Sequence, residues 1–110
     1  MFIFDLFRVR KRIKAPWEKY YTLKDRKLRI PDITIYDQVV KSAKKYPKHR
    51  AIRYFNTIIN FKNLVKTIDR TAVCYSNLGI KKGDIVTICS PNIPEALISV
   101  YALNKIGAIA

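Results

Sequence analysis

The sequence predicts an α/β fold, with a β-hairpin, amphipathic helices and one βαβ crossover, that is incomplete at its C-terminus. Two β-rich runs, residues 51–55 and 58–61, are close enough in the chain to pair as a hairpin. Apolar residues with helical spacing lie on both sides of this hairpin. A nearly continuous apolar run at residues 85–89, a helical stretch at 93–106 and a new strand from residue 108 make up the crossover.

The helix before the hairpin is expected to begin after Thr34, whose hydroxyl suits an N-cap position. The helix ends with two lysines, which favour a helix C-terminus, shortly before Pro47. Its apolar face consists of Ile35, Val39, Val40 and Ala43. Asn56 and Thr57 separate the two β-rich runs and are therefore the expected turn of the hairpin.

A long amphipathic helix is predicted after the hairpin. Its apolar stripe consists of Leu64, Ile68, Ala72, Tyr75 and Leu78. Gly79 stands where a C-terminal cap belongs, because glycine adopts the left-handed conformation that often ends a helix. Residues 81–84 then form a turn that leads into the predicted strand.

The last predicted helix begins with a pair that resembles a capping box, Asn92 and Glu95, and it ends at Gly107. A second strand opens at residue 108 and is cut short of the usual strand length of about five residues. The elements over residues 34–110 therefore predict the first part of a larger α/β domain.

The net charge of the 110-residue chain is +14, which is typical of proteins that bind nucleic acid or anionic membranes. Ten Lys/Arg and three acids lie in residues 1–29, and this concentration argues against nucleic acid as the partner. Residues 1–16 form a basic and apolar leader, of which residues 1–14 offer a helix for peripheral contact with an anionic membrane. A frayed terminus, or a helix packed on its own domain, is favoured over membrane contact for this segment. Residues 17–33 are predicted to be an irregular approach segment.

Candidate catalytic residues are sparse, and no catalytic, cofactor-binding or metal-ligating residue is assigned. His49 has no second metal ligand nearby, and a Cys89–His49 pair would lack an orienting group and an oxyanion hole. Asp84 and Glu95 suit a turn and a helix cap better than an acid/base pair. Cys74 and Cys89 are expected to be small buried thiols in a reducing, cytoplasmic setting. The glycines match no phosphate-binding pattern and are expected in turns and helix caps: Gly79, Gly83 and Gly107.

Six short stretches follow one another in a specific order. They are WEKYY at 17–21, IPDITIY at 30–36, SAKKYP at 42–47, LGIKKGD at 78–84, PNIPE at 91–95 and LNKIGA at 103–108. In this order they resemble the opening of AMP-forming acyl-CoA ligases of the adenylate-forming superfamily, and the long-chain fatty acid branch most of all. The family has a Leu-Thr-Tyr-x-Glu-Leu motif where this chain has INFKNL, which departs from it at Asn60, Phe61 and Asn63.

The resemblance implies that residues 34–110 are the N-terminal portion of the large adenylate-forming domain. Members of the family use ATP, Mg and coenzyme A to convert a fatty acid to an acyl-adenylate and then to an acyl-CoA. Their phosphate loop, Thr-Glu motif, ribose-binding Asp and catalytic Lys have no counterpart in this sequence, so the chain alone is expected to be inactive. Two alternatives stay open: a small basic module that binds anionic membrane or nucleic acid, and one half of a split ligase that a separate C-terminal chain completes.

Overall fold

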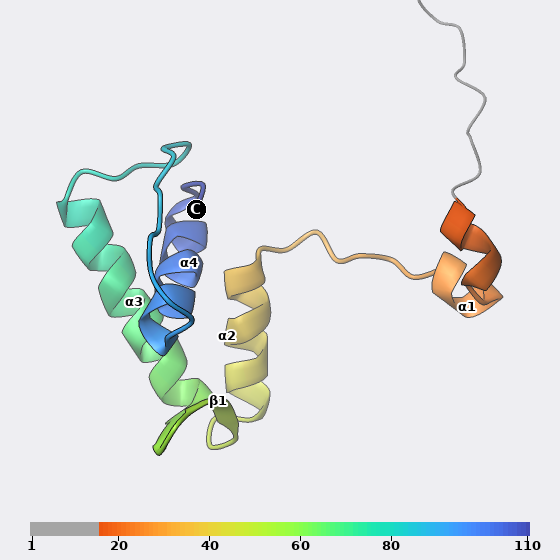
Figure 1. Ribbon diagram of the computed structural model, residues 1–110, viewed down its shortest axis with the longest axis horizontal. Helices are drawn as coiled ribbons and strands as arrows, with labels where there is room; N and C mark the ends of the chain where they lie inside the picture. Colours follow the sequence, from red (N-terminus) through yellow and green to blue (C-terminus); the bar gives the residue numbers. More distant parts are fainter. Residues whose placement is uncertain (1–15) are drawn as a thin grey trace, which may run out of the picture. The chain divides into compact units, whose positions relative to one another are not determined.

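The computed structural model describes residues 16–110, apart from the side chains of Glu18 and Arg26. The chain divides into two compact units, Met1–Pro31 and Asp32–Ala110 (Figure 1), and each is described by itself. The segment predicted to contact a membrane, residues 1–14, lies outside the described residues.

The first unit contains a 3-10 helix, η1 (Pro16–Tyr20), and one turn of α-helix, α1 (Leu23–Arg26). Thr22 and Asp25 form a capping box at the start of α1. The Thr22 hydroxyl accepts a hydrogen bond from the Asp25 N–H at 3.2 Å, and the Asp25 carboxylate accepts one from the Thr22 N–H at 3.0 Å. The region predicted to be irregular therefore holds short helices, because side-chain caps can stabilise single turns that show no apolar period.

Helix α2 (Ile35–Lys45) opens the second unit and begins where the sequence predicts. The Thr34 hydroxyl accepts a hydrogen bond from the Asp37 N–H at 3.0 Å, and the Asp37 carboxylate accepts one from the Thr34 N–H at 3.2 Å. Two backbone donors at this helix end are thus paired. The predicted N-cap is confirmed, and the helix ends in the two lysines before Tyr46.

Helices α3 (Phe61–Asn77) and α4 (Pro94–Ile106) lie side by side and form the core (Figure 1). The core cluster consists of Leu64, Ile68 and Ala72 of α3 and Ile98 and Ala102 of α4. Full burial of an isoleucine or leucine stabilises a fold by about 1.5–3 kcal/mol, so this contact dominates the packing. The predicted stripe is confirmed at its first three residues. Leu78 is 77% exposed because it is the C-cap residue and lies past the packed helix.

Strands β1 (Arg50–Tyr54) and β2 (Thr57–Asn60) form the predicted antiparallel hairpin. The turn is Phe55-Asn56 and not Asn56-Thr57, because Thr57 pairs with Tyr54 and belongs to β2. Phe55 adopts a left-handed conformation with φ 47°. The hairpin leads directly into α3, where the Asn60 side chain accepts a hydrogen bond from the Asn63 N–H at 2.8 Å.

The predicted βαβ crossover is present as a single parallel bridge between Ile85 and Ile109. The Val86 N–H donates to the Ile109 carbonyl and the Ile109 N–H donates to the Asp84 carbonyl, both at 2.8 Å. The prediction of a strand over residues 85–89 is wrong in extent, because Ile109 is the one residue of the second strand that bridges to it. A strand is defined by its ladder of backbone hydrogen bonds, so residues 87–92 are irregular and have no strand partner.

Two further expectations for this region are wrong. Helix α4 has Ile93 as its N-cap, without a side-chain cap, so Asn92 and Glu95 form no capping box. Pro94 occupies the first turn, and its missing N–H leaves one fewer donor to satisfy. Cys74 and Cys89 are both exposed, since Cys74 lies off the buried stripe of α3 and the strand that would enclose Cys89 does not form.

Candidate functional site

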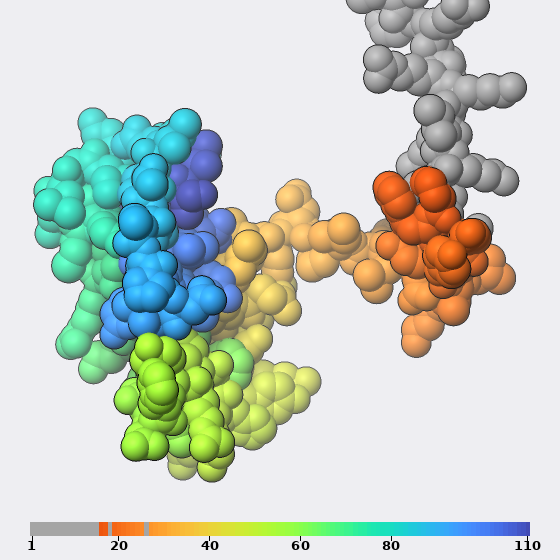
Figure 2. All heavy atoms as spheres, viewed as in Figure 1, coloured from red at the N-terminus to blue at the C-terminus, as the bar shows by residue number. Residues whose placement is uncertain are grey.

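An apolar groove lies between β1, the loop before α4 and the first turns of α4. Its volume is about 540 Å³. It is lined by Ile52, Arg53 and Tyr54 of β1, Ile88, Asn92 and Ile93 of the loop, and Pro94, Ala96, Leu97 and Val100 of α4. Figure 2 shows the hairpin, in lime, directly against the blue residues where α4 begins. The groove therefore joins the hairpin to the crossover.

Apolar side chains around the groove and the adjoining crossover remain in contact with water. Leu97 and Val100 of α4 are 39% and 36% exposed, although the opposite face of the same helix is buried. Ile85 and Ile109, the two bridging residues, are 80% and 55% exposed. Exposed apolar side chains gathered in this way are typical of a surface that contacts another polypeptide.

The chemistry of the groove suits contact with another polypeptide and not catalysis. Arg53 and Tyr54 are the ionisable side chains among its lining residues, and Asn92 is the one carboxamide. The lining contains no His, Cys, Ser, Asp, Glu or Lys, the side chains that most often act as general bases or nucleophiles. Within the described part of the chain, no three His, Cys, Asp or Glu side chains gather as metal ligands. The residues present therefore do not fit ATP with its Mg ion, and no reaction step is assigned to them.

A polar cluster ties the three long helices together on another part of the second unit. The Asp69 carboxylate of α3 accepts hydrogen bonds from the Tyr36 hydroxyl of α2 and the Lys105 ammonium of α4, both at 2.7 Å. The Tyr36 N–H also donates to the Asn104 side chain at 3.0 Å. The Lys105 nitrogen lies 5.0 Å from the centre of the Tyr36 ring. This cluster fixes the relative positions of the helices.

The electrostatics of the cluster are those of a paired carboxylate. Partial burial raises the pKa of Asp69, but hydrogen bonds from Lys105 and Tyr36 outweigh burial and hold it below its usual value. The hydrogen bond to Asp69 raises the pKa of Lys105. Burial and the neighbouring carboxylate raise the pKa of Tyr36. All three pKa shifts favour the charged forms of Asp69 and Lys105 and the neutral form of Tyr36, which are the forms that bind one another. This indicates a structural role for the cluster.

The residues that the sequence offers as catalytic candidates have local roles. The Asp84 carboxylate accepts a hydrogen bond from the Lys81 N–H at 2.7 Å, which closes the predicted turn. Glu95 lies in the first turn of α4. The His49 ring stacks on Tyr46 with their centres 4.9 Å apart, whereas Cys89 lies in the extended segment before α4. The three glycines, Gly79, Gly83 and Gly107, all have positive φ, as turn and cap positions require.

Sequence reasoning does not find the groove, although one signal points toward it. The apolar run at 85–89 is typical of a strand that is covered on both faces. In the structure one of its residues, Ile88, lines the groove, and Ile85 is exposed. The run thus marks a face that is built for burial.

No helix within residues 16–110 has both the length and the apolar character needed to cross a bilayer.

Curated relatives match about two thirds of the chain. Acetyl-coenzyme A synthetase 1 of Debaryomyces hansenii is 39% identical in an alignment of 80 residues that covers 67% of this chain and 12% of that protein. Acetyl-coenzyme A synthetase 1 of Candida albicans is 36% identical over the same length. The chain thus spans about one-eighth of the length of these relatives. They are acetyl-CoA synthetases, whereas the motifs resemble the long-chain branch.

Solved structures show the same fold. The N-terminal subdomain of NpsA from Klebsiella oxytoca is 29% identical with a TM-score of 0.66, covering 68% of this chain and 20% of that one. Coronafacic acid ligase from Pectobacterium brasiliense is 34% identical with a TM-score of 0.67, covering 69% and 15%. The family of AMP-binding enzymes matches residues 39–110, from α2 through the crossover. Because this match takes in more than half of the sequence, the chain belongs to the AMP-binding enzyme family.

Proposed function

We propose that residues 17–110 supply the N-terminal scaffold of an AMP-forming carboxylate–CoA ligase, and that the 110-residue chain alone does not catalyse the reaction. The family match and the fold of the second unit support the first part. The second part is supported by the chemistry of the groove, whose lining offers apolar contact and one arginine.

The reaction to which the scaffold contributes has two steps. A carboxylate oxygen attacks the α-phosphorus of ATP and expels pyrophosphate, which gives an acyl-adenylate. The thiol of coenzyme A then attacks the acyl carbon and expels AMP. The acid is a fatty acid by the resemblance of the motifs, while acetate is the acid named in the relatives.

The observation that carries the proposal is the apolar face formed by the groove and the parallel bridge. Residues 87–90 follow the bridge without a strand partner, so their backbone groups are available to a further parallel strand. Leu97 and Val100 extend this surface along α4. A complementing chain that carries the rest of an AMP-binding domain would bury the face by pairing with this edge.

Complementation tests this proposal. The partner is the D. hansenii synthetase without the 80 residues that match this chain. ATP–pyrophosphate exchange is measured with acetate and with a long-chain fatty acid as substrates, for the chain alone, the partner alone and the mixture. We expect exchange in the mixture and none in either part.

Variants show whether the groove mediates complementation. Leu97→Asp places a carboxylate in the groove and is expected to abolish both co-purification and exchange, because an unpaired charge is costly to bury. Val73→Asp is the matched control, since Val73 is 59% exposed on α3 and is not part of the groove lining. Exchange by the chain alone, or full activity with Leu97→Asp, would contradict the proposal.

We also propose that the chain resides in a reducing compartment of the cell. Cys74 and Cys89 are free and exposed, and exposed thiols persist most readily in a reducing compartment. A cytoplasmic setting for this chain is consistent with that chemistry.

A further inference from the structure

A second surface, separate from the groove and beyond the proposed ligase role, is formed by basic residues around the hairpin. Residues 38–68 contain eight Lys/Arg and no Asp or Glu. We define the basic end of the second unit as Lys44, Lys45, Lys48, Arg50 and Lys62, all of which are exposed. Asp69 and Lys105 form the one ion pair among the described side chains. No described carboxylate therefore pairs with a residue of the basic end.

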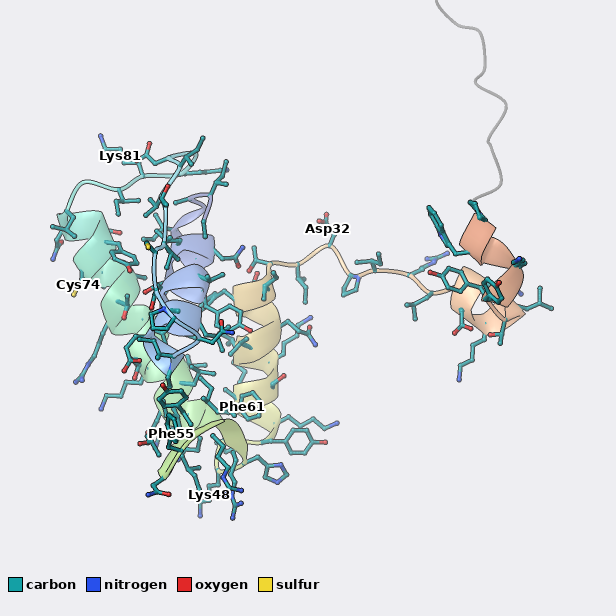
Figure 3. The ribbon with its side chains drawn as sticks, viewed as in Figure 1. Asp32, Lys48, Phe55, Phe61, Cys74 and Lys81 are labelled. Carbon is teal, nitrogen blue, oxygen red and sulfur yellow. The ribbon has the colours of Figure 1, made fainter. Side chains whose placement is uncertain are left out.

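Backbone contacts hold these residues at one end of the unit. The Lys62 N–H donates to the Pro47 carbonyl at 3.1 Å, and the Phe61 N–H donates to the His49 carbonyl at 3.0 Å. The start of α3 is thereby fixed against the loop that links α2 to β1. Figure 3 shows Lys48 at the tip of this region, beyond the ends of the helices and close to the hairpin. These five positive charges therefore gather at one end of the second unit.

An apolar tip adjoins this charge. Phe55 is 81% exposed at the hairpin turn, and Ile58, the next outward apolar residue, is 50% exposed. The Phe55 ring meets the Tyr54 ring edge-on, with their centres 4.6 Å apart. Phe55 has φ 47°, a conformation that hairpin turns normally give to Gly or Asn. A bulky exposed side chain at such a position is a backbone outlier that points to a contact role.

Basic side chains beside an exposed aromatic tip are the combination that binds the interface of an anionic bilayer. The cations are attracted to acidic headgroups, while the apolar tip enters the boundary between headgroups and acyl chains. Single-stranded nucleic acid would also be attracted by the charge and would stack on Phe55, but the other exposed apolar residue of the hairpin, Ile58, is aliphatic, which suits acyl chains and offers no ring to a base. We propose that the basic end and the Phe55 tip form a docking surface for an anionic lipid bilayer.

Vesicle binding by the full chain tests the charge. The probes are vesicles of phosphatidylcholine with a minority of phosphatidylglycerol, and vesicles of phosphatidylcholine alone. Replacing Lys45 and Lys48 together by Gln should weaken binding to the anionic vesicles roughly 25-fold, at about five-fold for each charge near the surface. The control replaces Lys81 and Lys82 by Gln, which removes the same charge from the turn before the crossover and should change binding less than about two-fold. Equal losses in the two variants would overturn the proposal.

A substitution at the turn tests the apolar tip without endangering the fold. Phe55→Asn removes the ring and places there a residue that tolerates positive φ, so the hairpin is retained. Binding to anionic vesicles should fall several-fold, and Phe55→Trp should show a blue-shifted emission when vesicles are added in a chain whose Trp17 is replaced by Phe. Unchanged vesicle binding by Phe55→Asn, together with tight binding of a single-stranded RNA that depends on Lys45 and Lys48, would contradict the proposal and assign the surface to nucleic acid.

Discussion

Ile68 and Ile85 are the same residue type in two regions of one small unit, and their environments are opposite. Ile68 of α3 is fully buried between helices, whereas Ile85 of the parallel bridge is 80% exposed. The helical region satisfies its backbone within each helix and buries one stripe against another helix of the same unit. The crossover region has backbone groups without ladder hydrogen bonds and apolar side chains in contact with water. Only further strands could supply the missing bonds and cover these side chains. A helical pair can therefore be complete while the sheet beside it is not.

The largest expected change in the free energy of unfolding comes from replacing one of these isoleucines by alanine. Ile68→Ala should lower the free energy of unfolding by about 2–5 kcal/mol, because it removes buried methyl groups and leaves a cavity. Ile85→Ala should change it by less than about 0.5 kcal/mol, since the side chain is already in water. Urea unfolding followed by circular dichroism measures both. Similar losses for the two variants would show that the regions are not distinct.

Glycines at two helix ends sharpen the comparison at its boundary. Gly107 has φ 85°, and an added Cβ would come within 2.9 Å of the Lys82 side chain. Gly79 has φ 90° with open space around it. Gly107→Ala should destabilise the fold by roughly 1–2 kcal/mol, and Gly79→Ala by about 1 kcal/mol, because both force alanine into the left-handed region. Thermal unfolding of the two variants measures the difference, and a smaller effect at Gly107 would contradict the packing seen at the crossover.

The two capping boxes test whether the first unit contributes to the stability of the second. Thr34→Ala should lower the free energy of unfolding by about 1 kcal/mol, because the start of α2 loses its cap. Thr22→Ala removes the same kind of cap from the single turn of α1 and should change unfolding of the second unit by less than about 0.5 kcal/mol. Denaturant midpoints of the two variants provide the measurement. A larger effect at Thr22 would mean that α1 stabilises the helical core.

Titration of Asp69 gives the smallest expected effect. Its pKa lies below the usual value of 3.8, so the paired carboxylate stabilises the folded state above about pH 3.8, and this contribution is lost as pH falls through the folded pKa. The Asp69 side chain is 42% exposed, so the contribution stays below about 1 kcal/mol. Asp69→Asn should be less stable than the parent at neutral pH, and the gap should close in acid. A gap that stays constant between neutral and strongly acidic pH would exclude the ion pair as its cause.

The helical half of the fold could be predicted from local signals. Thr34 carries its cap in its own side chain, and the spacing of Leu64, Ile68 and Ala72 defines a buried face wherever the partner helix comes from. The turn at Phe55 could not be predicted, because an aromatic residue rarely takes positive φ and the sequence favours Asn56 as the start of the turn. The position of Ile93 as N-cap could not be predicted either, because its side chain cannot form a capping hydrogen bond.

The sheet half could be predicted in type but not in extent. The apolar run from Ile85 indicates a strand that is covered on both faces, and the parallel bridge to Ile109 confirms the direction of pairing. How far a strand extends depends on residues distant in sequence, which no local pattern reveals. The exposure of Cys89 has the same cause. The groove arises only when β1 and α4 come together, so it has no signature in either segment alone.

Amide hydrogen exchange of the full chain, resolved by residue, is the most direct test of the central claim that a finished helical core stands beside an unfinished sheet. We expect strong protection at the buried turns of α3 and α4, around Ile68 and Ala102, and exchange close to that of an unfolded chain at residues 87–92. When the complementing chain is added, protection should appear at 87–92 and remain unchanged in the helices. Equal protection of the two regions in the chain alone would contradict the account, because it would show that residues 87–92 already belong to a complete fold.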